Sequence, residues 1–156
     1  MLMHGLVLAG AERHPDRVAL RWVDRDRALT YAQAADAMER MAGALASLGV
    51  QKGDRVTVFA HNGLDYVAAM LGAWRLGAIA ALVNVRFAAE LGDYFADHTP
   101  KVVVYTHDMG EAVRRAKGAA AIRLVCMDGP QDGAHSLPEL MAAALPAPVD
   151  PADEAA

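Results

Sequence analysis

Apolar runs of four to eight residues alternate with helical patterns through most of this 156-residue chain. The runs lie at 55–60, 79–85, 102–106 and 121–127. The segments between them are long enough for helices of about ten residues, and strands joined in this way need crossover connections. Such connections produce a largely parallel sheet with helices on both faces. We therefore predict an α/β fold.

The longest helical pattern follows Thr30. Thr30 and Gln33 match a capping box, in which the threonine hydroxyl accepts from a first-turn amide and the glutamine reaches back to the amide of residue 30. Apolar residues then recur on one face as far as Gly49, which ends the pattern. Further helices are expected at 2–12, from the cap at 62–63 to 75, at 88–97, at 108–117, and from a second capping box at 136–139.

A small antiparallel hairpin is predicted near the N-terminus. Val18, Leu20 and Trp22 alternate with their neighbours in the manner of a half-buried strand, and the turn at 24–26 can return the chain.

Residues 1–143 are expected to form one α/β subdomain. A chain of 156 residues buries about 68–70% of its unfolded surface, enough for a core without disulfides. The segment 144–156 is rich in proline and alanine without an apolar period, and we predict that it is a linker or a loosely held tail.

The stretch 67–85 is apolar enough to raise the question of a membrane span. It carries a single charge, Arg75, which would cost roughly 2.5–3.5 kcal/mol at the centre of a bilayer. Gly72 and Gly77 also weaken a continuous helix. A helix ending near Gly77, followed by a buried strand at 78–85, is the favoured interpretation.

Charge and cysteine content exclude several classes of function. The chain has 15 basic and 19 acidic residues, a net charge of −4, and so lacks the basic excess that nucleic-acid binding requires. Its single cysteine, Cys126, cannot form an intramolecular disulfide, and the first residues do not resemble a secretion signal. We expect a cytoplasmic protein with no nucleic-acid partner and no transmembrane segment.

A search for catalytic, cofactor-binding and metal-binding motifs assigns no residue to any of these roles. No Gly-rich phosphate loop is found, because the Gly72–Gly77 pair lacks the following lysine and hydroxyl residue and is better explained by packing. No serine nucleophile motif is found, and no two histidines have the i, i+4 spacing of a metal site. Cys126 is expected to be a small buried hydrophobe.

Three short polar stretches follow predicted strands: His61-Asn62, Asn84-Val85-Arg86 and His107-Asp108. The carboxyl ends of parallel strands are where open α/β sheets bind ligands, which makes these stretches candidates for a site. Helix capping by Asn62 and Asp108, and solvation or ion pairing of Arg86, explain the same residues without a ligand, and we favour that interpretation.

Several segments, taken in order, resemble the N-terminal region of AMP-forming acyl-CoA synthetases, members of the adenylate-forming family. LTYAQA (29–34) resembles the family's Leu-Thr-Tyr-x-Glu-Leu motif, with Gln33 and Ala34 differing from its last two residues. LGAIAALVNVR (76–86) resembles a Gly-Ala-x-x-x-Pro-Leu-Asn-Pro-Arg segment, with Leu82 and Val85 where prolines are common. The likeness covers most of residues 13–128.

This resemblance implies that the parent protein is an acid–thiol ligase. Such an enzyme activates a carboxylic acid, with fatty or aromatic acids as the leading candidates, using Mg and ATP to form an acyl-adenylate, and then transfers the acyl group to CoA. The family's phosphate loop, which ends in Pro-Lys-Gly, follows a segment like DPADEAA (150–156) and is not found here. We therefore expect a catalytically inactive N-terminal fragment of a larger multi-subdomain fold, which itself binds neither ATP, Mg nor CoA.

A subdivided fold is also expected to expose an apolar face. The remainder of the parent enzyme, or a second copy in a homo-oligomer, would cover it. The alternative function is a free-standing α/β module that binds a small ligand or a protein near His61, Asn84 and His107.

Overall fold

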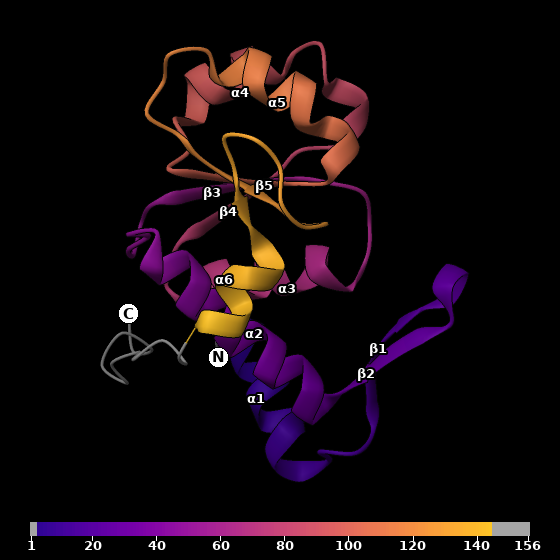
Figure 1. Cartoon of the computed structure of the whole chain (residues 1–156). Helices are drawn as coiled ribbons and strands as arrows, with labels where there is room; N and C mark the ends of the chain where they lie inside the picture. The colour runs from indigo at the N-terminus through magenta and orange to yellow at the C-terminus, as the bar shows by residue number, and fades with distance from the viewer. Residues whose placement is uncertain (1–2, 145–156) are drawn as a thin grey trace.

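The computed structural model describes residues 3–144 (Figure 1). Its helices and strands are α1 (Met3–Arg13), β1 (Val18–Trp22), β2 (Arg27–Thr30), α2 (Tyr31–Ser47), β3 (Arg55–Phe59), α3 (Leu64–Arg75), β4 (Ile79–Leu82), α4 (Leu91–His98), β5 (Val102–Tyr105), α5 (Gly110–Lys117), β6 (Arg123–Cys126), β7 (His135–Ser136) and α6 (Leu137–Ala143). Short 3-10 turns occur at Val23–Arg25, Val85–Phe87 and His107–Met109.

Five of the strands form one parallel sheet in the order β4-β3-β5-β6-β7. β1 and β2 form a separate antiparallel pair, which stands apart from the main sheet in Figure 1. The α/β class, the parallel sheet and the N-terminal hairpin are therefore confirmed. β7 was not predicted, because two residues are too short to show an alternating pattern.

Helices cover both faces of the sheet, as predicted. Figure 1 shows α4 and α5 on one side and α2, α3 and α6 on the other. Each face of the sheet has its own hydrophobic core, and alternate strand residues belong to one or the other. Val56 and Val58 pack with α2 and α3, whereas Phe59 and Tyr105 pack with α4 and α5. β5 is the middle strand of this sheet, and all four of its residues are buried.

The capping box at Thr30 is confirmed. The Gln33 amide donates to Thr30 Oγ1 at 3.3 Å, and the Thr30 amide donates to Gln33 Oε1 at 2.9 Å. The second predicted capping box, at Ser136, is wrong: Ser136 is the N-cap of α6 but makes no side-chain cap bond. Pro138 occupies the second position of that helix and has no N–H to offer.

Two other helices start later than predicted. α4 begins at Leu91 rather than 88, because Asn84 Oδ1 accepts from the Arg86 amide at 2.9 Å and holds the next residues in a 3-10 turn. α5 begins at Gly110 rather than 108, after a 3-10 turn that contains Asp108.

The apolar stretch 67–85 divides into a helix and a strand, as predicted. α3 ends at Arg75, and Gly77 has a φ of 67°, in the left-handed region that favours glycine. Within α3, a Cβ on Gly72 would lie 2.5 Å from Met41 Cγ, so Gly72 serves the close packing of α2 on α3. Within residues 3–144, no helix has both the length and the apolar character needed to cross a membrane.

The prediction that the strand after α3 is buried is wrong. β4 is an edge strand with β3 as its neighbour in the sheet, and Ile79 and Leu82 are 53% and 45% exposed. Phe87 and Tyr94, which follow in the chain, are also exposed, and their rings lie 6.1 Å apart. These four residues are called the β4 apolar surface below.

At the C-terminal end of the described chain, α6 ends at Ala143. The predicted linker at 144–156 lies outside the described residues except for Ala144. Leu2, at the start of the first predicted helix, lies outside them as well.

Candidate functional site

The carboxyl edge of the sheet contains a point where the direction of winding reverses. From β3 the chain enters α3, which packs in one core, and from β5 it enters α5, which packs in the other. The loops after these adjacent strands therefore diverge and leave a crevice between them. This is the position at which open α/β sheets bind ligands.

A side-chain hydrogen bond spans this crevice. His61, in the loop after β3, donates from Nε2 to Oδ2 of Asp108, in the turn after β5, at 2.7 Å. Burial alone would raise the pKa of the Asp108 carboxyl, but the hydrogen bond from His61 and smaller contributions outweigh it and lower that pKa below its usual value. Both side chains are more than half exposed, so a ligand can reach them.

The loop after β6 holds the same turn from the other side. Asp128 accepts a hydrogen bond from the His107 amide, and Gln131 Nε2 donates to the His107 carbonyl at 3.1 Å. Gln131 Oε1 in turn accepts from the buried Tyr105 hydroxyl at 2.5 Å. The position of Asp108 is thus fixed by contacts from two neighbouring loops.

A cavity of about 330 Å³ lies between this edge and the N-terminal hairpin. Trp22 of the hairpin packs on the start of α3, where a Cβ on Gly63 would approach its ring to 3.3 Å, and Arg25 lies over that ring at 5.7 Å. Asp65, Asp108 and Asp128 line this cavity. Burial raises the pKa of Asp65; Asp128 also raises it, whereas Arg27 lowers it.

A second cavity, of about 370 Å³, adjoins the first. It is lined by Asn84 and Arg86 from the loop after β4. His61, Asn62 and Tyr66 line both cavities and form their common wall. The three polar stretches that the sequence singled out therefore lie along one edge.

The structure corrects the roles expected for two of these residues. Gly63, not Asn62, is the N-cap of α3, and no side chain bonds there. Asp108 does not cap α5, whose N-cap is Met109; its carboxylate contacts His61 instead. Arg86 is exposed and Cys126 is buried, as predicted, and burial raises the pKa of the Cys126 thiol.

Sequence reasoning missed Asp128, Gln131 and the hairpin residue Trp22. Asp128 follows a predicted strand and the same edge rule would have found it, whereas Gln131 and Trp22 approach the edge through tertiary packing that leaves no local pattern. Within the part of the chain that the structure describes, no group of three or more His, Cys, Asp or Glu side chains could hold a metal ion.

Comparison with known proteins gives a consistent family match. A family model described as "AMP-binding enzyme" matches residues 8–155. A fatty acid–[acyl-carrier-protein] ligase, MmaC of Mycobacterium marinum, is 32% identical over 83% of the chain. A long-chain-fatty-acid–CoA ligase, FadD13 of Mycobacterium tuberculosis, is 40% identical over 51% of the chain.

Solved structures share the fold as well. The N-terminal domain of FACL13 from Mycobacterium tuberculosis superimposes with a TM-score of 0.83 at 26% identity over 94% of this chain. The chain spans 25% of the length of the first relative, 16% of the second and 37% of the solved domain.

Proposed function

This chain belongs to the AMP-binding enzyme family, and we propose that it forms the N-terminal part of an AMP-forming acyl-CoA synthetase. The parent enzyme joins a carboxylic acid, most simply a fatty acid, to ATP to give an acyl-adenylate and pyrophosphate. The thiol of CoA then attacks the acyl carbon and AMP leaves. ATP, Mg and CoA are the cofactors and co-substrate of the parent.

The observation that carries this proposal is the activity for which the relatives are named. They are named as ligases of fatty acids, and one of them matches most of the chain. One relative is named for CoA and the other for an acyl carrier protein, so the thiol that receives the acyl group is the part of the proposal that most needs a direct assay.

Within the parent, we propose that residues 1–143 are a structural subdomain without catalytic activity of their own. The described residues do not fit Mg-ATP: they contain no three-ligand metal cluster and no Gly-rich phosphate loop. We therefore assign no step of the reaction to this chain, and its two cores support the downstream parts instead.

The proposal includes residues 144–156 as the linker to those downstream parts. A cytoplasmic location is also part of it. The free thiol of Cys126 supports this location, since unpaired cysteines are usual in reducing compartments.

Acid-dependent exchange of pyrophosphate into ATP tests both the activity proposed for the parent enzyme and the inactivity proposed for this chain alone. The parent enzyme should catalyse exchange with fatty acids, and the purified chain 1–156 should not. Exchange by the chain alone would show that it is not merely structural. Supplying CoA or an acyl carrier protein to the parent then identifies the thiol acceptor.

The alternative, a free-standing ligand-binding module, is favoured by the two adjoining cavities at the carboxyl edge. Reading the gene beyond the codon for Ala156 decides between the two. A reading frame that continues into a Ser/Thr/Gly-rich loop with Pro-Lys-Gly supports the synthetase, whereas a stop codon supports the module.

A further inference from the structure

Asn62 and Gly63 form an Asn-Gly pair in the short loop between β3 and α3. Asn62 is exposed and lines both cavities of the carboxyl edge, so water reaches its side-chain amide. It caps no helix, since Gly63 is the N-cap of α3. Among residues 3–144 the Asn62 side chain has no hydrogen-bond partner. The amide is therefore unprotected, and the proposed ligase function does not use it.

Gly63 supplies a nucleophile next to this amide. The first N–H groups of a helix have no partner within that helix, and no side chain caps α3. The Gly63 N–H accordingly makes no hydrogen bond to the described residues. Residues 62 and 63 lie outside the neighbouring strand and helix, and glycine has no Cβ to hinder the approach of its nitrogen to the Asn62 side chain.

We propose that Asn62 is a site of spontaneous deamidation. The Gly63 nitrogen attacks Asn62 Cγ, and the new C–N bond closes a succinimide ring. The proton of the Gly63 N–H passes to solvent, while the Asn62 side-chain nitrogen takes up a proton from solvent and leaves as ammonia. Water then opens the ring at either carbonyl and gives aspartate or isoaspartate. The overall reaction consumes water and releases ammonia, with no other reactant.

The product places a new negative charge directly before α3. Helix N-termini favour negative charge, and α3 spans 12 residues, so aspartate suits this position. Isoaspartate instead adds a methylene group to the backbone beside Gly63, where an added Cβ would already lie 3.3 Å from Trp22 Cη2. Deamidation therefore changes the charge and shape of the wall that the two cavities share.

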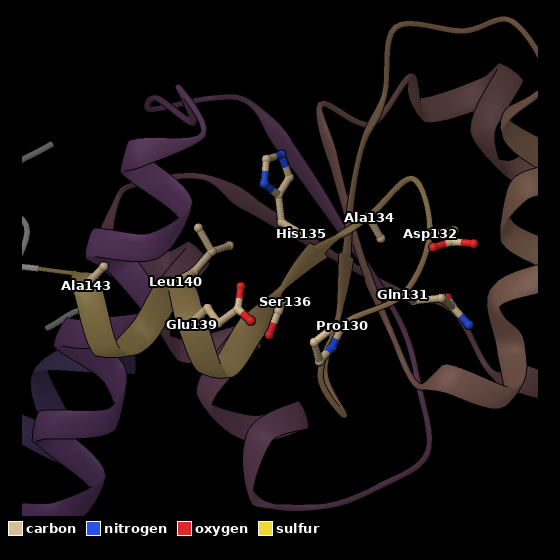
Figure 2. A pocket seen from close by; sticks show the side chains of 9 residues that line it. All are labelled: Pro130, Gln131, Asp132, Ala134, His135, Ser136, Glu139, Leu140 and Ala143. Atoms are coloured by element: carbon tan, nitrogen blue, oxygen red, sulfur yellow. The ribbon is translucent and has the colours of Figure 1, made fainter.

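Asn84, the other asparagine of the chain, is an internal control. It is exposed like Asn62, but its Oδ1 accepts from the Arg86 amide at 2.9 Å, and the β-branched Val85 follows it. Both features hinder ring closure. Asp132 also precedes a glycine, and Figure 2 shows its side chain in the loop before β7. A carboxyl group has no ammonia to release, so this pair produces no mass change.

Peptide mass spectrometry of the purified chain, incubated in mildly alkaline buffer, tests the proposal. Trypsin cleaves after arginine, so Asn62 falls in the peptide 56–75 and Asn84 in the peptide 76–86. We expect peptide 56–75 to gain the mass difference between NH₂ and OH at least about tenfold faster than peptide 76–86, after subtraction of a sample digested at time zero. Circular dichroism checks that the chain stays folded throughout.

Asn62→Gln, whose longer side chain disfavours the ring, should abolish the mass gain of peptide 56–75 and leave peptide 76–86 unchanged. On anion exchange, the aged chain should form a more acidic species that elutes alongside Asn62→Asp. The proposal is overturned if the folded chain keeps Asn62 as intact as Asn84, or if Asn62→Gln gains mass in peptide 56–75 at the same rate as the unmodified chain.

Discussion

Thr57 Oγ1 and His98 Nε2 lie 2.6 Å apart and join the middle of β3 to the last residue of α4. Thr57 has no exposed surface, and the Arg55 side chain donates from Nε to the His98 carbonyl at 2.7 Å. The end of α4 is therefore fastened to β3 through both the side chain and the backbone of one histidine.

Protonation of His98 should destabilise the fold. Burial lowers the pKa of His98; Asp97 opposes this effect and Arg55 adds to it. The unfolded chain therefore binds a proton at higher pH than the folded chain, and stability should fall as the pH drops below about 6.5. In urea unfolding, the free-energy difference between the unmodified chain and His98→Asn should shrink from pH 7 to pH 5. A constant difference for His98→Asn would contradict the assignment.

Gly72→Ala should destabilise the chain by about 1–3 kcal/mol through overpacking. The new methyl group would lie 2.5 Å from Met41 Cγ and 3.0 Å from the Ala42 backbone nitrogen, and a backbone atom cannot move aside as a side chain can. Gly92→Ala in α4 meets no atom within 4 Å and should be neutral or stabilising by up to about 1 kcal/mol. Chemical denaturation of both variants checks the pair, and similar effects at the two sites would be inconsistent with close packing at Gly72.

Gln131→Ala should cost about 1–3 kcal/mol, because it leaves the Tyr105 hydroxyl buried without a partner. The same substitution should cost less in a Tyr105→Phe background, where no hydroxyl remains to be satisfied. A double-mutant cycle measures this coupling, which we expect to be at least about 0.5 kcal/mol. Strict additivity would mean that the Tyr105–Gln131 bond does not contribute to stability.

Thr30→Ala and Ser136→Ala should differ in their effect on the stability of the fold, although both residues are helix N-caps. Thr30 accepts a real cap bond from Gln33, so its loss should cost about 1 kcal/mol. Ser136 makes none, so removing its buried hydroxyl should be neutral or stabilising. Thermal unfolding of the two variants distinguishes them, and a clear loss of stability for Ser136→Ala would point to a cap bond in solution.

The β4 apolar surface should make the isolated chain associate. Ile79 and Leu82 flank the open backbone of an edge strand, a usual site of strand-to-strand association. Light scattering after size exclusion should show a mass that rises with concentration, and replacing both residues with lysine should remove this rise. Val23→Lys, at an exposed hairpin position, is the control. A strictly monomeric chain would contradict the prediction.

The sequence was most informative where local physics decides the structure. The capping box at Thr30, the end of a helix near Gly77 and the strand-helix alternation depend on near neighbours, and each was predicted correctly. The capping box predicted at Ser136 was wrong, because the sequence motif does not show whether the serine hydroxyl accepts from the helix amides. The exposure of β4 was mispredicted because an apolar run does not show whether a strand lies at the edge or the centre of its sheet.

The sequence predicted the residues of the candidate site but not the contact between them. Strand ends are visible in sequence, so the positions of His61 and Asp108 along one edge could be anticipated. Their direct contact depends on β3 and β5 being neighbours in the sheet, which no local pattern encodes.

The adjacency of β3 and β5 also has a consequence for biosynthesis. Val56 pairs with Val102, forty-six positions later, whereas each outer pair joins segments that are much closer in sequence. Local units close first, so the central pair should be the last to form. At about 5–20 residues per second, the ribosome delivers β5 roughly 2–9 s after β3. During that interval one edge of β3 is unpaired, and its valines are available to a chaperone on the nascent chain.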